Sequence, residues 1–298
     1  MAAPVLAVAI EPGRLAAGLV GADGAVMVRD RVTMPSRDVW RSLERLVRRV
    51  NAAAPHGLVP FNAVGVSCVG PVDERAGTVS PPHVPGWASF PLRDHLEDLT
   101  QQPVTLSSAG SAAAEAERRL GEARDTASYL FVVADATVDS ACVIDGRRVQ
   151  GAHGNAGGIA HITVSPDDGS LRCWCGATGC LEPYLASIAL EAEMNRPLRR
   201  ANPSMIERGG IMLGRAVASM CASLDVSTVF VTGGVIDAFG DQLLDTARRE
   251  LHTRSRLATL ADLRLVEPVE HLGPLARAAA MVDAAGLIDG VARSATAR

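Results

Sequence analysis

Strand-like apolar runs are followed by amphipathic helices twice along this 298-residue chain, an order typical of α/β folds. The first set opens with three runs separated by glycine-containing turns, which predict an antiparallel meander over residues 5–32. The second set opens with two strand-like runs around a polar loop, at residues 129–144. We therefore predict two α/β lobes, residues 1–117 and 118–279, with a last helix over about 280–298 that packs back on the first lobe.

The helices are predicted from apolar residues that recur at steps of three and four and so share one face. Hydrophobic residues make up 48% of the chain, which is enough to bury a core in each lobe. The two clearest apolar faces are Trp40, Leu43, Val47 and Val50, and Leu213, Val217, Met220 and Leu224.

Charge and composition exclude several classes of protein. The net charge is −4 and the isoelectric point about 6.0, so no direct binding to nucleic acid is expected. No apolar run approaches the roughly 20 residues that cross a bilayer, and no basic segment precedes the N-terminal apolar stretch, so neither a membrane span nor a signal peptide is expected. Six cysteines without a secretory signal indicate the cytoplasm. All 29 basic residues are arginine, which excludes a lysine nucleophile.

Three of the six cysteines, Cys173, Cys175 and Cys180, lie within eight residues, downstream of His161. Glycines between them allow a tight loop, and the turn SPDDGS returns the chain toward His161 as a hairpin does. Zinc binds thiolates and imidazole in a closed tetrahedron at structural sites. The alternatives are a chance cluster and a local disulfide, which would leave one cysteine unpaired. We predict a structural zinc ion held by all four residues.

The segment GAHGNAGGIAHITV followed by CWCGATGCLEPY resembles the motif GANGxAGEIGH…CxCGxxGCxE of the ROK family of repressors, open reading frames and sugar kinases. VGVSCVGPVDERAGTVSPPHVPGW, LDVSTVFVTGGV and LGPLARAAAMVDAAGLI resemble further segments of that family. The resemblance covers nearly the whole chain and extends to bacterial glucokinases. It implies a two-lobed, actin-like (ribonuclease H-like) sugar-kinase fold with a zinc-binding hairpin, a ligand in the cleft, and often a dimer.

Three stretches that serve phosphoryl transfer in the family kinases are altered. Their opening motif DxGGTK corresponds to AIEPGR here, at residues 9–14. This stretch introduces a carboxylate and also a proline, which has no N–H group. Their phosphate loop GTGxGGG is DATVDSA at residues 135–141, with two acids that repel phosphate unless Mg²⁺ binds them. Their catalytic base in NDANAAA is replaced, because Ala109 occupies its position in SAGSAAA. The resemblance therefore implies a pseudokinase with no catalytic residue, for which ATP–Mg²⁺ is not expected.

The sugar-binding positions are partly retained. Gly158 replaces the family's glutamate of GEIGH, and His83 replaces an asparagine, whereas His161 and Glu182 are kept. His161 serves zinc as well as sugar in the family, and Glu182 also suits a helix start. The candidate ligand-binding residues are His83, Asp135, Asp139, His161 and Glu182.

Three hypotheses for function follow from these observations. The first is a ROK-fold protein without kinase activity that binds a sugar-like small molecule, or regulates through a protein partner, as a homodimer or homo-oligomer. The chain begins at its first strand, so a winged helix is not expected. The second is a divergent ATP-dependent kinase that phosphorylates an alcohol group of a sugar or cyclitol, with Glu11, Asp135 and Asp139 holding Mg²⁺ and His83 or Glu182 as the base.

The third hypothesis keeps the fold of an enzyme but changes its reaction. A cleft with His83, His153, Asp135 and Asp139 suits acid–base catalysis on a metabolite that is not phosphorylated.

Overall fold

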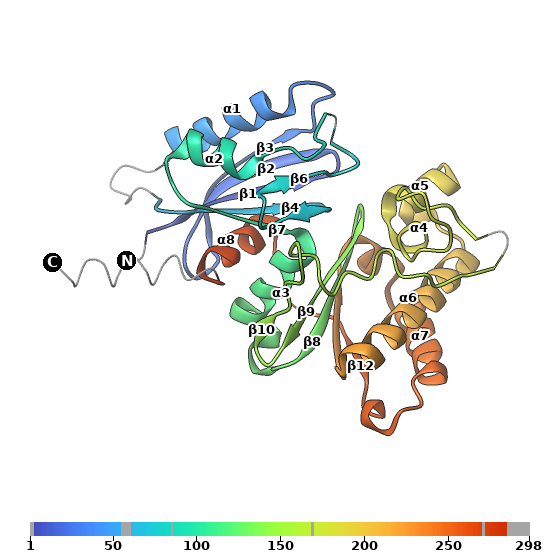
Figure 1. The fold of residues 1–298 in the computed structure, drawn as a ribbon. Coiled ribbons are helices and arrows are strands. Elements are labelled where there is room, and N and C mark those ends of the chain that lie inside the picture. Colours follow the sequence, from blue (N-terminus) through green and yellow to red (C-terminus); the bar gives the residue numbers. More distant parts are fainter. Residues whose placement is uncertain (1–2, 55–60, 85, 168–169, 270–271, 285–298) are drawn as a thin grey trace. The chain divides into compact units, whose positions relative to one another are not determined.

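The computed structural model describes residues 3–54, 61–84, 86–167, 170–269 and 272–284, and it contains two compact units (Figure 1). Unit 1 takes residues 1–125, 150–155 and 272–298, and unit 2 takes residues 126–149 and 156–271. The boundary lies after Asp125 rather than at residue 117, because helix α3 (Ala109–Leu120) continues past that residue and packs against the following turn, η1 (Glu122–Asp125).

Unit 1 is built on a five-stranded sheet in the order β3-β2-β1-β4-β7. The first three strands pair antiparallel, so the predicted meander over residues 5–32 is confirmed, while β4 and β7 run parallel to β1. The small strands β5 and β6 pair with each other. The strands are β1 (Val5–Glu11), β2 (Arg14–Val20), β3 (Val26–Thr33), β4 (Val64–Cys68), β5 (Val72–Asp73), β6 (Thr78–Val79) and β7 (Val104–Ser108).

Helices cover both faces of this sheet, so β1 is buried on both sides. Leu6 and Val8 belong to the core with α1 (Val39–Ala52) and α2 (Leu92–Thr100), whereas Ala7 and Ala9 belong to a smaller core with α8 (Pro274–Ala284). Small residues allow α8 to lie close to the strands: a Cβ on Gly65 of β4 would lie 2.0 Å from a backbone oxygen of α8.

The last helix packs on unit 1, against α3, β1 and β4, but it begins earlier than residue 280. Pro274 starts α8, as expected for a residue that has no N–H group to satisfy in the first turn. Residues 285–298 of the predicted helix lie outside the described residues.

Unit 2 repeats this arrangement of strands, with the order β10-β9-β8-β11-β12. Strands β8, β9 and β10 pair antiparallel, and β11 and β12 run parallel to β8. The elements are β8 (Tyr129–Ala134), β9 (Val138–Ile144), β10 (Arg147–Arg148), α4 (Glu182–Leu185), α5 (Ser187–Met194), η2 (Leu198–Arg200), α6 (Pro203–Leu224), β11 (Thr228–Thr232), α7 (Gly234–Arg254), η3 (Ala258–Leu260) and β12 (Arg264–Val266).

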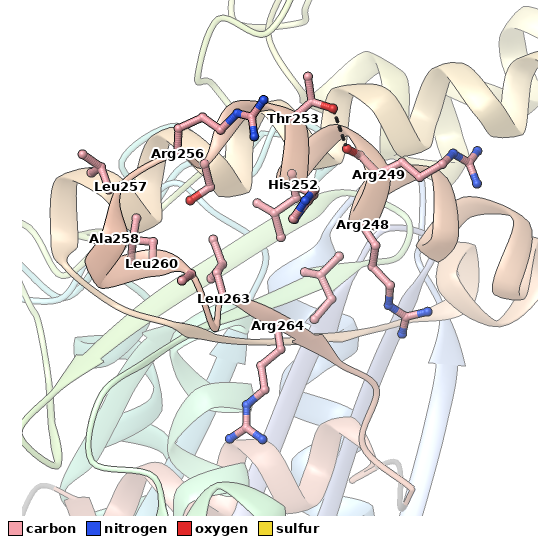
Figure 2. Close-up of a pocket in the computed structure, with 14 residues that line it drawn as sticks. Arg248, Arg249, His252, Thr253, Arg256, Leu257, Ala258, Leu260, Leu263 and Arg264 are labelled. Atoms are coloured by element: carbon pink, nitrogen blue, oxygen red, sulfur yellow. Dashed lines mark hydrogen bonds between the residues drawn. The ribbon is translucent and has the colours of Figure 1, made fainter.

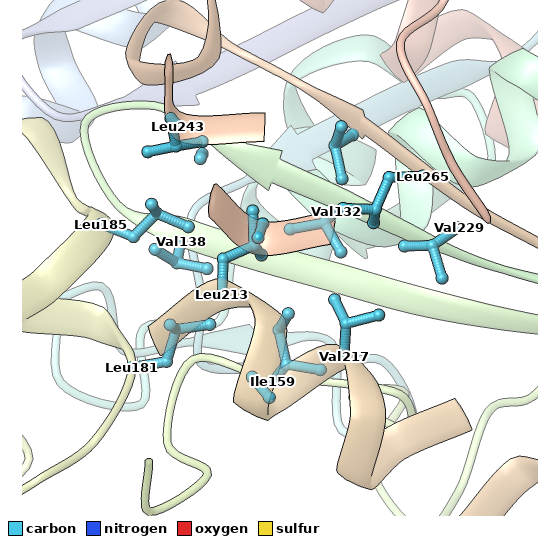
Figure 3. Packing of buried hydrophobic residues seen from close by; sticks show 14 of the residues in the cluster. Val132, Val138, Ile159, Leu181, Leu185, Leu213, Val217, Val229, Leu243 and Leu265 are labelled. Atoms are coloured by element: carbon cyan, nitrogen blue, oxygen red, sulfur yellow. The ribbon is translucent and has the colours of Figure 1, made fainter. Parts of the chain in front are cut away.

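The core of unit 2 lies between this sheet and helices α6 and α7. Figure 3 shows Val132 and Val229 of the sheet facing Leu213 and Val217 of α6, the helix whose apolar face the sequence predicts. Asn202 caps α6 by accepting a hydrogen bond from the Met205 N–H at 2.8 Å. Among the described residues, no helix is both long and apolar enough to cross a membrane.

Candidate functional site

The four predicted metal ligands lie together in unit 2. One ligand atom from each of His161, Cys173, Cys175 and Cys180 lies within 4.8 Å of all the others. The Cys175 and Cys180 sulfurs are 3.8 Å apart, and the Cys173 sulfur is 3.5 Å from His161 Nδ1. Tetrahedral zinc, with bonds of about 2.3 Å to sulfur and about 2.0 Å to nitrogen, requires separations of about 3.8 Å and about 3.5 Å. These donor atoms therefore fit zinc, and the six cysteines are all free thiols.

The metal loop, residues 161–180, is folded by backbone hydrogen bonds. The Val164 N–H donates to the Gly179 carbonyl at 2.8 Å, and the Cys173 N–H donates to the Ala177 carbonyl at 2.8 Å. Gly176 and Gly179 have φ of +94° and +77°, the left-handed region in which glycine is favoured. Asp168 and Gly169 of the predicted SPDDGS turn lie outside the described residues.

Trp174, which the spacing of the metal ligands does not predict as a site residue, joins the metal loop to Glu182. Its ring meets that of His161 edge to face, with centroids 4.9 Å apart at 80°, although 45% of the residue is exposed. Its side chain also forms a hydrogen bond with Glu182. A tryptophan between two metal-binding cysteines is the sequence signal for such a contact.

Glu182 starts α4 and is a buried carboxyl group with a strongly raised pKa. It is only 4% exposed, and its Oε2 accepts a hydrogen bond from the Val138 N–H at 2.9 Å. Its pKa is raised to about 7, mainly by burial and in smaller part by the charge of Asp139. The hydrogen bonds with Val138 and Trp174 act in the opposite direction and lower the pKa. Glu182 therefore changes protonation near neutral pH and can either donate or accept a proton.

Asp135 lies in the β8–β9 loop and Asp139 in β9, within the stretch 135–141 that resembles the family's phosphate loop. The Asp135 N–H donates to the Thr137 carbonyl at 3.0 Å, the Val138 N–H to Glu182, and the Ser140 N–H to Asp139 Oδ1 at 2.8 Å. Three amides of the stretch 135–141 thus have acceptors within unit 2, so a phosphate would have to displace these acceptors.

In unit 1, the stretch of residues 9–14 forms the end of β1, a turn and the start of β2. Glu11 forms an ion pair with Arg14, whose Nε lies 2.9 Å from Glu11 Oε2. The arginine therefore offsets much of the repulsion that the Glu11 carboxylate would exert on a phosphate.

Ala109 is the first residue of α3, where the family kinases carry their base. Ser108 caps the helix by accepting a hydrogen bond from the Ser111 N–H at 3.1 Å. The first turn of α3 contains no acid, and Glu115, further along, pairs with Arg118. No carboxylate in this turn replaces the missing base.

The histidines of unit 1 differ in their surroundings. His83 is half-buried, and burial lowers its pKa below the ordinary value. His153, to which the sequence assigns no definite role, has its Nδ1 2.9 Å from Asp73 Oδ2, and its carbonyl accepts the Glu74 N–H at 2.9 Å. With Asn155, which bonds the backbone of β5, it anchors residues 150–155 to unit 1. His83 therefore belongs to unit 1, whereas Asp135, Asp139, His161 and Glu182 belong to unit 2.

The sequence pattern of the ROK family matches residues 6–271. An N-acetylmannosamine kinase of Escherichia coli is 30% identical over 246 residues, 77% of this chain and 82% of the kinase. A glucokinase of Halalkalibacterium halodurans is 28% identical over 212 residues, 60% of this chain, and the match spans only 64% of the glucokinase.

Solved structures give the same relationship. A ROK hexokinase from Thermus thermophilus superimposes with a TM-score of 0.76 at 27% identity, covering 97% of this chain and 99% of the hexokinase. A ROK family transcriptional regulator, a homologue of the E. coli MLC protein, shares the fold, with a TM-score of 0.83 at 22% identity over 98% of this chain and 80% of the regulator. This chain belongs to the ROK family and has the α/β fold of the ROK sugar kinases.

Proposed function

We propose that this ROK protein binds a sugar-like small molecule and does not phosphorylate it. The observation that carries the proposal is Ala109 at the start of α3, in a first turn without an acid. A methyl group accepts no proton, and general-base catalysis contributes about 10²- to 10⁴-fold to a rate. The hydrogen-bonded amides of Asp135, Val138 and Ser140 support the same conclusion, because a phosphate would have to displace their acceptors.

We further propose that His161, Cys173, Cys175 and Cys180 hold a structural zinc ion. Zinc supplies no step of a reaction in this proposal. It fixes the metal loop from which Trp174 reaches Glu182, because four bonds to one ion restrain a segment with little regular structure.

The ligand chemistry follows from the polar groups that unit 2 presents. A buried carboxyl group with a pKa of about 7, that of Glu182, suits the hydroxyl groups of a sugar, since it accepts hydrogen bonds when ionised and donates one when protonated. We assign Asp135, Asp139, His161 and Glu182 of unit 2 to the ligand; a role for His83, which belongs to unit 1, stays a prediction from the sequence.

Calorimetry with glucose, N-acetylmannosamine and myo-inositol, with and without ATP–Mg²⁺, tests the proposal. We expect one of these compounds to bind, its affinity to fall at least tenfold in Glu182→Gln, and exposed Glu207→Gln to bind as the unaltered protein does. No ADP should form. Steady formation of ADP and a sugar phosphate would contradict the proposal. The predicted homodimer is tested separately, by measuring the molar mass with light scattering.

A divergent sugar kinase is the second candidate, favoured by the kinase activity of the relatives and by the pKa of Glu182, which suits a base. In that case ADP formation with a sugar would be abolished in Glu182→Gln and retained in Glu207→Gln. Turnover that survives Glu182→Gln would remove Glu182 from the role of base.

A further inference from the structure

A pocket of about 870 Å³ lies at the C-terminal end of α7, bounded by that helix, η3 and β12 (Figure 2). Its volume falls within the range of about 300–1,000 Å³ typical of small-molecule sites. It lies wholly within unit 2 and shares no residue with the metal loop or with Glu182. Leucines line part of it, and five basic residues line the rest: Arg248, Arg249, His252, Arg256 and Arg264.

The ionisable residues that line this pocket are all basic, and none is acidic. Arg248 is paired with Asp245 at 2.9 Å, and Arg249 donates to Thr246 Oγ1 at 2.8 Å. Within the part of the chain that the structure describes, Arg256 and Arg264 have no ion-pair partner. Basic side chains without an acid among the lining residues give the pocket a positive potential, which attracts an anion.

Helix electrostatics explain only some of these residues. Basic side chains in the last turns of a helix interact favourably with its partial negative charge, which accounts for Arg248, Arg249 and His252. Arg256 and Arg264 lie beyond the end of α7 at Arg254, so this effect does not account for them. In addition, the hydroxyl oxygen of Ser255, another lining residue, is buried and has no hydrogen-bond partner among the described residues.

We propose that this pocket binds a small organic molecule that carries at least two phosphate groups. Arg256 and Arg264 bind phosphate oxygens in the bidentate manner of guanidinium groups, and the Ser255 hydroxyl donates a hydrogen bond to the same ligand. Figure 2 shows Arg256 and Arg264 on opposite sides of His252, with their side chains pointing away from each other, so each guanidinium group would contact a different phosphate group of the ligand. The leucines contact the organic part of the ligand.

The test is calorimetric titration of the full chain with inorganic pyrophosphate, orthophosphate and ATP at constant ionic strength. We expect pyrophosphate and ATP to bind more tightly than orthophosphate. The double variant Arg256→Gln/Arg264→Gln should weaken pyrophosphate binding about 100-fold, because each guanidinium group removed weakens it about tenfold. Arg41→Gln/Arg45→Gln, which removes two exposed arginines of α1 in unit 1, should change nothing.

Absence of pyrophosphate binding, or equal loss in both double variants, would overturn the proposal. Ser255→Ala provides a second variant that keeps the charge, and a several-fold loss of affinity is expected from it. A DNA duplex that binds with a loss of affinity in Arg256→Gln/Arg264→Gln would overturn the assignment to a small molecule. Glu182→Gln should leave pyrophosphate binding intact, which separates this proposal from the proposed function.

Discussion

Glu182→Gln has a pH-dependent effect on stability that the structure predicts in sign and size. The pKa of this carboxyl group is raised from 4.5 to about 7 by burial in the folded protein. The folded state therefore binds the proton more tightly than the unfolded state, and this contribution is fully present below pH 4.5 and lost as the pH rises through 7. At 1.36 kcal/mol for each pKa unit, the loss amounts to about 3 kcal/mol by pH 8. Glutamine, which is neutral at every pH, lacks this dependence.

Urea unfolding of the zinc-loaded protein at several pH values between 4.5 and 8 measures the effect. The free energy of unfolding of Glu182→Gln, minus that of the unaltered protein, should rise by about 3 kcal/mol across this range. Subtracting the two free energies of unfolding cancels the contributions of groups that titrate in both proteins. For the control Glu207→Gln, on the exposed face of α6, the same difference should not change with pH. A flat difference for Glu182→Gln, or one that falls with pH, would refute the argument that burial dominates at Glu182.

Four further predictions concern the metal loop and the packing of α8. Cys180→Ser should abolish retention of zinc measured by elemental analysis, whereas Cys221→Ser, buried outside the cluster, should retain it. Zinc removal by a chelator should lower the free energy of unfolding by at least ~2.7 kcal/mol, the contribution of a ligand at 100 times its dissociation constant. In urea unfolding, Gly179→Ala should destabilise more than Gly176→Ala: both have positive φ, which costs about 1–2 kcal/mol, but only at Gly179 would the Cβ meet a backbone oxygen, at 1.8 Å. Gly65→Ala should lower the melting temperature, since its Cβ would lie 2.0 Å from an α8 oxygen; a change within error would contradict the close packing.

Local patterns determine most of the elements. The glycine turns between apolar runs predict the β1–β3 meander, and the three- and four-residue steps of Leu213 and Val217 predict the buried face of α6, because both patterns act through neighbouring residues. The return of residues 150–155 to unit 1 is not predicted, because it depends on hydrogen bonds from His153 and Asn155 to residues about 80 positions away.

At the candidate site too, some features can be predicted from the sequence and others depend on the fold. The sequence predicts His161, Cys173, Cys175 and Cys180 as a cluster, since glycines between the three thiols allow a tight loop and the SPDDGS turn returns the chain toward His161. The ionisation of Glu182 depends on segments that are distant in the sequence, because it arises from burial in the folded unit, from the Val138 amide and from the charge of Asp139. The basic pocket beyond α7 likewise required the folded chain, since only the packing of η3 and β12 brings Arg256 and Arg264 to one cavity.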